Sequence, residues 1–341
     1  MGVVYEINPA VQGKAAETVL YNFAGNGDGA NPIGDLVFDP SGNLYGVTQF
    51  GGTSNQGTVF ELSPPSAQGG AWTETLLYSF QGMPSDGAQP AAGLIFDGAG
   101  NLYGTTSAGG IDSGFCEGGC GTAFDLSPPS VRGGSWTENV LYFFQGDPDG
   151  AEPLGALIFD QTGNLYGTTF IGGDLGGGTV FELSPASEQG GAWSETILCK
   201  FTRESGGDPA AGLVFGSDGT LYGTGTAGGL HGDGTVFRLK PPLSQGGAWS
   251  LGVLHNFDGS RDGASPYAAL TIGNSRTLYG VNDAGFVFRI SASGGAANFA
   301  VLYVFDSSHP RTRLTLYNNA LYGTTGSGGY KKDGTVFKLS P

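Results

Sequence analysis

The stretch GTVFELSP (Gly57–Pro64) decides the fold of this chain, because it returns along all 341 residues with small changes. The copies are GVVYEINP (2–9), GTAFDLSP (121–128), GTVFELSP (178–185), GTVFRLKP (234–241), GFVFRIS (285–291) and GTVFKLSP (334–341). Val, Phe and Leu alternate with Thr, Glu and Ser, and the run ends at Pro, as in a half-buried β-strand. Seven copies of one strand indicate a tandem-repeat protein.

Three other phrases accompany this strand in a fixed order. Examples are the run TLLYSF (75–80), the short apolar run GLIFD (93–97) and the segment GNLYGTT (100–106), and each phrase occurs six times. The repeat is roughly fifty to sixty residues long and holds four strands. Because 65 Gly and 18 Pro argue against long helices, the chain is predicted to be all-β.

Four-stranded units that repeat in this way are typical of β-propeller blades. We assign GLIFD as inner strand A, NLYGTT as B, TVFELSP as C and VLYxF as outer strand D. The prediction is one domain, residues 1–341, with six antiparallel blades. Its closing blade would combine residues 1–25 with residues 311–341, so that strands from both termini close the ring. One of the seven C copies is then redundant; it is displaced, adds a fifth strand or pairs with another molecule.

Composition and motifs narrow the function. The net charge is −16 and the pI is near 4.3, which disfavours binding to nucleic acids or anionic membranes. No apolar run of ~18 residues predicts membrane insertion. Catalytic signatures such as GxSxG, HExxH or a phosphate-binding loop are absent. We expect no cofactor and no metal centre.

The cysteines point to an oxidising compartment. Cys116 and Cys120 bracket a glycine turn in the longest B–C loop, where a disulfide would stabilise the loop by about 2 kcal/mol. A metal site is the alternative. Cys199 and His255 replace the Tyr of VLYxF and are interpreted as packing residues. Because Met-Gly directly precedes a blade strand, we expect that a signal peptide was removed from this sequence and that the protein is extracellular or at the cell surface.

The connections from strand D to the next strand A carry the main site candidates. They read DGANP, DGAQP, DGAEP, SGGDP, DGASP and DSSHP, and the residue before Pro is always polar and always different. The set is Asn31, Gln89, Glu152, Asp208, Ser265 and His309. These residues are either exposed, tolerant loop positions or a ligand-binding ring at the channel mouth. Glu152 and Asp208 are the closest approach to paired carboxylates, and with His309 they are the catalytic candidates.

B–C loops are predicted on the same face. They add Phe50, Phe115, Phe170, His231 and Tyr330, beside the basic Lys331 and Lys332. Aromatic rings beside carboxylates suit sugar recognition, because a ring covers the apolar face of a pyranose. The tryptophans in GGAW or GGSW are interpreted as packing residues between blades, with a carbohydrate platform as the alternative. They are Trp72, Trp136, Trp193 and Trp249.

The units GNLYGTTSAGG…GTAFDLSPPS…GGSWTENVLYFF and GNLYGTTFIGG…GTVFELSPAS…GGAWSETILCKF resemble the GloVer-type tandem repeat of bacterial choice-of-anchor proteins. The resemblance implies a bacterial protein that is exported or attached to the cell surface, without an activity to transfer. We therefore carry three hypotheses: a propeller that binds a small molecule or glycan, a glycosidase-, lyase- or lactonase-type enzyme, and a self-associating structural protein.

Overall fold

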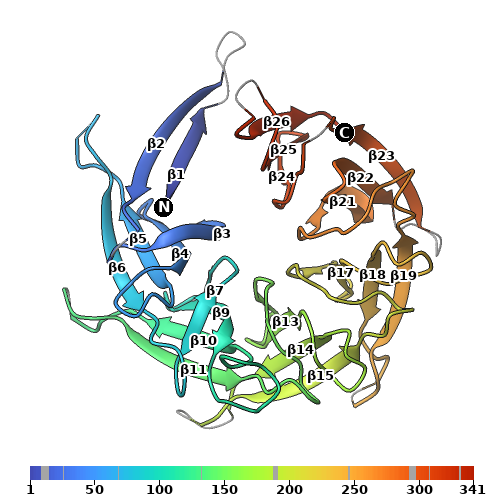
Figure 1. Cartoon of the computed structure of the whole chain (residues 1–341), viewed down its shortest axis with the longest axis horizontal. Helices are drawn as coiled ribbons and strands as arrows, with labels where there is room; N and C mark the ends of the chain where they lie inside the picture. Colours follow the sequence, from blue (N-terminus) through green and yellow to red (C-terminus); the bar gives the residue numbers. More distant parts are fainter. Residues whose placement is uncertain are drawn as a thin grey trace. The chain divides into compact units, whose positions relative to one another are not determined.

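The computed structural model is an all-β protein (Figure 1). It describes residues 1–8, 15–25, 27–67, 69–131, 133–186, 191–244, 246–291, 297–306, 308–329 and 332–341. The chain divides into two compact units, Met1–Gln145 and Gly146–Pro341. Over the described residues the only helix is the 3-10 turn η1 (Asn274–Arg276), and no helix has the length and apolar character needed to span a membrane.

The first unit contains a hairpin and two complete blades. The hairpin pairs β1 (Gly2–Asn8) with β2 (Ala16–Phe23). The first blade has the order β3 (Ala30–Phe38), β4 (Leu44–Phe50), β5 (Thr58–Ser63) and β6 (Thr73–Ser79). The second has β7 (Gly87–Pro90) and β8 (Ile95–Phe96), which both pair with β9 (Leu102–Gly109), then β10 (Thr122–Ser127) and β11 (Thr137–Phe143).

The second unit contains three complete blades and a three-stranded sheet. The first of these blades has the order β12 (Ile158–Phe159), β13 (Leu165–Thr169), β14 (Thr179–Ser184) and β15 (Ser194–Lys200). The next has β16 (Val214–Phe215), β17 (Leu221–Gly225), β18 (Thr235–Lys240) and β19 (Ser250–Asn256). The third has β20 (Thr271–Ile272), β21 (Thr277–Val281), β22 (Phe286–Ser291) and β23 (Asn298–Val304). The last sheet is β24 (Thr315–Tyr317), β25 (Ala320–Thr325) and β26 (Thr335–Leu339).

These pairings confirm the predicted strand order and the six-bladed propeller fold. Sequence-adjacent strands pair antiparallel in the order A, B, C, D, and the outer pair carries a bulge at the same place in each complete blade, between Val59 and Phe60 for example. As predicted, the chain starts with strands C and D, here β1 and β2, and ends with A, B and C, here β24 to β26. The union of these two sheets into one closing blade remains a prediction, as does the choice between β1 and β26 for position C.

A repeated aromatic core explains the phrases. The Phe of strand C is fully buried in each complete blade, as Phe60 and Phe124 show. A Cβ on the glycine of LYG would lie 2.7 Å from this ring, both at Gly46 against Phe60 and at Gly104 against Phe124. Glycine is therefore required beside the phenylalanine, because core side chains leave no room for another atom.

Trp136 and Trp249 pack between blades, as predicted for the tryptophans. Trp136 precedes β11, and its ring centroid lies 6.3 Å from that of Tyr45 on β4 of the neighbouring blade. Trp249 precedes β19 and has the same 6.3 Å separation from Tyr166 on β13. Both indoles are half-buried in the hydrophobic clusters at these joints. The repeated spacing indicates an architectural role for these two side chains rather than a sugar platform.

Candidate functional site

Buried aspartates anchor the D–A connections. Asp86 accepts hydrogen bonds from the hydroxyl of Tyr78 at 3.0 Å and from the backbone N–H of Gln81 at 2.6 Å. Asp28 is held in the same way, by the hydroxyl of Tyr21 at 3.2 Å and a backbone N–H at 2.8 Å. Tyrosine at the end of strand D and aspartate in the following turn therefore act together to fix the loops that carry Asn31 and Gln89.

A glutamate from the next blade completes this cluster. Glu74, Glu138 and Glu195 occupy one position on three outer strands, and burial raises the pKa of each. The pKa of Glu138 reaches about 8 through burial and then through the charges of Asp86 and Asp125. That of Glu195 reaches about 7 through burial and the charge of Asp149, against Lys200. These carboxyl groups hold protons at a pH where an exposed glutamate is ionised.

In one blade the tyrosine, the aspartate and the glutamate are all replaced. Cys199 replaces the tyrosine, Ser205 replaces the aspartate, and Leu251 replaces the glutamate. Leu251 packs against an apolar cluster. Cys199 packs against the same cluster, as predicted, and burial raises the pKa of its thiol to about 11.

The second replacement keeps the aspartate. His255 Nε2 lies 2.6 Å from Asp262, and its ring stacks on Phe299, at the glutamate position, with centroids 3.7 Å apart. His255, Asp262 and Phe299 thus contact one another at this joint, in agreement with the interpretation of His255 as a packing residue.

The pre-proline candidates share an unusual backbone. Five of the six have a left-handed φ between 53° and 58°; they are Asn31, Gln89, Glu152, Asp208 and Ser265. This conformation is strained for residues other than glycine, and persists only where the surroundings hold it. The N–H of Gln89 donates to the carbonyl of Gln56 at 2.7 Å, and that of Asp208 donates to Gly177 at 2.9 Å. Both acceptors lie in the B–C loop of the preceding blade, so these loops share one face as predicted.

The side chains of this set have different surroundings. Asn31 donates to Gln49 Oε1 at 2.7 Å. Burial raises the pKa of Glu152. Burial also raises the pKa of Asp208, although the positive charge of Arg203 acts to lower it. The charge of one carboxylate does not contribute to the pKa shift of the other. His309 lies 2.5 Å from the carbonyl of Asp283 through Nδ1. The structure therefore gives the predicted carboxylate pair and histidine no common partner among the described residues.

Asp208 lines a pocket of about 810 Å³ in the second unit. Its walls come from the D–A connection at Arg203–Asp208 and from the B–C loops on either side, after β13 and after β17. The lining residues are Ile171, Leu175, Gly176, Gly177, Arg203, Glu204, Gly207, Asp208, Ala227, Gly228, Gly229 and Gly232. Half are glycines, so peptide groups form much of the wall beside three charged side chains. Sequence reasoning found Asp208 but missed Arg203, Glu204 and Leu175, because nothing local distinguishes them from ordinary loop residues.

The aromatic candidates that the structure describes do not line this pocket. Phe50, Phe115 and His231 are exposed and Phe170 is half-buried on their own loops. Lys332 is exposed, and Tyr330 and Lys331 lie outside the described residues. A further cluster was not foreseen: Arg311 binds both oxygens of Asp283, at 2.6 and 2.8 Å, and lies over the Tyr267 ring at 5.8 Å. Arg311 comes two residues after His309, the last pre-proline candidate. Its contacts with Asp283 and Tyr267 could not be predicted from the repeats, because each partner lies far away in the sequence.

Cys116 and Cys120 form a disulfide with Cα atoms 5.2 Å apart, as predicted. Within the described part of the chain, no group of three or more His, Cys, Asp or Glu side chains is placed to hold a metal ion. The bond closes a short loop, so its stabilising effect is limited.

Comparison with known proteins agrees with this fold. A family described as the Gloeobacter/Verrucomicrobia repeat matches residues 1–192 and again residues 189–341. No curated protein sequence matches the chain. A luciferin-regenerating enzyme has 14% identity and a TM-score of 0.54, with 92% of each chain covered. A protein of unknown function from Dyadobacter fermentans has 14% identity and a TM-score of 0.53, covering 91% of this chain and 93% of its own.

A putative oxidoreductase (glucose dehydrogenase) from Thermus thermophilus has 15% identity and a TM-score of 0.51, covering 91% of this chain and 97% of its own. At such identities the three structures share the fold with this chain and establish nothing about its chemistry.

Proposed function

The chain belongs to the Gloeobacter/Verrucomicrobia repeat family, and we propose that it is a secreted or cell-surface propeller that binds a carbohydrate in the pocket at Asp208. The observation that carries this proposal is the position of that pocket, where one D–A connection meets two B–C loops. Loops that vary on a rigid scaffold are where binding residues concentrate. The Cys116–Cys120 disulfide supports an oxidising compartment outside the cytoplasm.

The chemistry of the pocket suits a polyhydroxylated ligand. Asp208 and Glu204 accept hydrogen bonds from hydroxyl groups, and Arg203 donates to them. The glycine-rich walls present peptide groups of both kinds at close range. Ile171 and Leu175 supply apolar contact, and Leu175 is 54% exposed, so its side chain is available to the C–H face of a sugar ring. None of the lining residues is aromatic, so stacking is not part of the proposal.

Preorganisation favours binding by this pocket. The Asp208 backbone is fixed on both sides, because its N–H donates to Gly177 and its carbonyl accepts from Thr226 Oγ1 at 2.7 Å. Gly207 and Ala227 exchange two hydrogen bonds, at 2.8 and 3.2 Å, which tie the connection to the adjacent loop. Little backbone order has to be gained when a ligand binds, so less of the interaction energy is lost to entropy.

A glycan array followed by calorimetry on the strongest ligand tests the proposal. Asp208→Asn and Arg203→Gln are each expected to weaken binding about tenfold, the effect of losing one charged hydrogen bond. Asp174→Asn is the matched control, because this exposed carboxylate lies in the same B–C loop but does not line the pocket. An array without a ligand, or equal affinity in all three variants, would contradict the proposal.

A further inference from the structure

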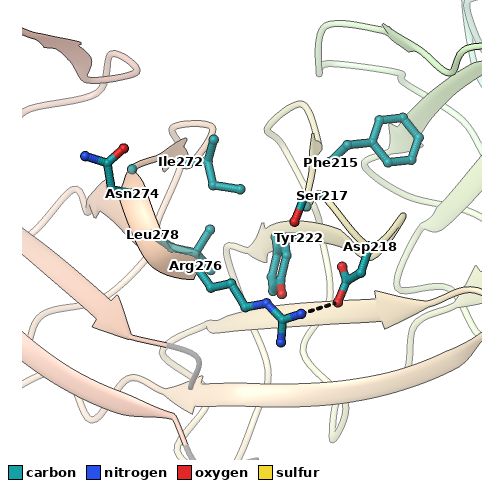
Figure 2. Close-up of a pocket in the computed structure, with 10 residues that line it drawn as sticks. Phe215, Ser217, Asp218, Tyr222, Ile272, Asn274, Arg276 and Leu278 are labelled. Atoms are coloured by element: carbon teal, nitrogen blue, oxygen red, sulfur yellow. Dashed lines mark ion pairs between the residues drawn. The ribbon is translucent and has the colours of Figure 1, made fainter. Parts of the chain in front are cut away.

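A second pocket, of about 670 Å³, lies between two turns of neighbouring blades in the second unit (Figure 2). One turn joins β16 to β17 and the other joins β20 to β21. These turns are at the opposite ends of strands A and B from the loops around Asp208. The pocket is therefore separate from the proposed carbohydrate site.

The pocket occurs where two consecutive repeats have lost a turn aspartate. Three earlier turns read FDPSGNLY, FDGAGNLY and FDQTGNLY, whereas these two read FGSDGTLY and IGNSRTLY. In the earlier turns the aspartate accepts from its Asn and from the Tyr hydroxyl, as Asp160 does from Asn164 at 2.9 Å and from Tyr166 at 3.3 Å. Gly216 and Gly273 stand at the aspartate position and provide no such acceptor.

The tyrosine rings pack against the two glycines. A Cβ on Gly216 would lie 3.0 Å from the Tyr222 ring, and one on Gly273 would lie 2.7 Å from the Tyr279 ring. In Figure 2 the Tyr222 hydroxyl points toward Arg276 and Asp218. Tyr222 is only 5% exposed, and it lines the pocket without the aspartate acceptor that Tyr166 has in its own turn.

Opposite charges line this space. Arg276 from one turn lies 3.4 Å from Asp218 in the other, with side chains 57% and 42% exposed. Hydrogen bonds from Thr220 and the charge of Arg276 lower the pKa of Asp218 in spite of the opposing effect of burial, so the carboxylate remains ionised. The half-buried Phe215 and Ile272, which is 37% exposed, add apolar surface beside the pair.

We propose that this pocket binds a small zwitterion, namely a free α-amino acid with an apolar side chain. Its ammonium group would bind Asp218, its carboxylate Arg276, and its side chain the apolar wall. The ammonium nitrogen and carboxyl carbon of an amino acid are about 2.5 Å apart, so both charges can face Asp218 and Arg276, whose nearest N and O atoms are 3.4 Å apart. Because an exposed ion pair contributes little to stability, a ligand that joins it disturbs little of the fold.

Calorimetry with L-leucine, L-phenylalanine, N-acetyl-L-leucine and L-leucine amide tests this inference. Both free amino acids are expected to bind, and each blocked derivative about tenfold more weakly, because it lacks one charged contact. Asp218→Asn should weaken L-leucine about tenfold but leave N-acetyl-L-leucine unchanged, since that contact is already missing. Arg276→Gln should behave in the same way toward the amide.

A variant that copies the chain's own repeats gives the control. Gly216→Asp with Thr220→Asn restores the sequence of the three earlier turns, so it is expected to fold, as circular dichroism would show, and to abolish L-leucine binding. Glu17→Gln, an exposed carboxylate in the other unit, should leave binding unchanged. No heat with either free amino acid at millimolar concentrations, equal binding of the blocked derivatives, or a neutral monosaccharide with the same dependence on Asp218 would overturn the inference.

Discussion

The proton held by Glu138 makes the stability of the first unit depend on pH. Oε1 of Glu138 and Oδ1 of Asp86 are both buried, and neither has a hydrogen-bond partner within the described part of the chain. A protonated Glu138 supplies the donor that two ionised carboxylates lack. We predict that Glu138→Gln, which keeps the shape and carries a permanent N–H donor, stabilises the protein at alkaline pH and leaves it unchanged at acidic pH.

The magnitude follows from the two pKa values. Folding raises the pKa of Glu138 from 4.5 to about 8, first through burial. Below both values each state is protonated, so the full stability is present. Between them the unfolded chain releases the proton and the folded chain keeps it, so stability falls as pH rises through this window. Each unit of pKa difference corresponds to ~1.4 kcal/mol, so the free energy of unfolding would fall by almost ~5 kcal/mol over this window. Solvent screens this half-buried group, and we therefore expect a loss of about 2 kcal/mol.

Urea unfolding followed by tryptophan fluorescence measures this change in the free energy of unfolding. It is carried out at about pH 5, close to the lower pKa, and at about pH 9, above the upper one. Glu138→Gln should match the wild type at the lower pH and exceed it by about 2 kcal/mol at the higher pH. Glu17→Gln is the matched control, because Glu17 occupies the equivalent repeat position but is exposed. The same difference at both pH values, or an equal gain in the control, would refute the reasoning.

Three further outcomes are expected. Trp136→Ala should lower the free energy of unfolding by about 3 kcal/mol in urea titrations, since it leaves a void against Tyr45, and an effect below about 1 kcal/mol would mean that the joint repacks. Replacing Cys116 and Cys120 by Ser should lower the free energy of unfolding by no more than about 2 kcal/mol. A larger loss would show that the disulfide also stabilises residues outside this loop. Hydrogen bonds lower the pKa of Asp97 against the effect of burial, so its contribution is present above the unfolded pKa and lost as pH falls through the folded value. Asp97→Asn should therefore flatten the acid limb of a stability-against-pH curve, and an unchanged limb would contradict this assignment.

The sequence by itself determined the strand phase and the repeat architecture. Period-two alternation in GTVFELSP fixes which side chains enter the core, and the copies of that phrase fix the blade order from β1 to β26. The short Cys116–Cys120 spacing and the recurring tryptophans were also readable, because local chain geometry and a constant repeat context decide them. All of these properties depend on residues close together in the chain or on identical positions in successive repeats.

Only the tertiary structure decided which variable positions meet. Glu138 lies beside Asp86, and Arg276 beside Asp218, although each pair comes from neighbouring blades and is separated by a long stretch of sequence. The loss of aspartate at Gly216 is visible in the sequence, but only the structure places this glycine and Tyr222 in the wall of one pocket with Arg276. The physical reason is that burial and charge act through space, so a side chain acquires its chemistry from the neighbours that folding brings within a few ångströms.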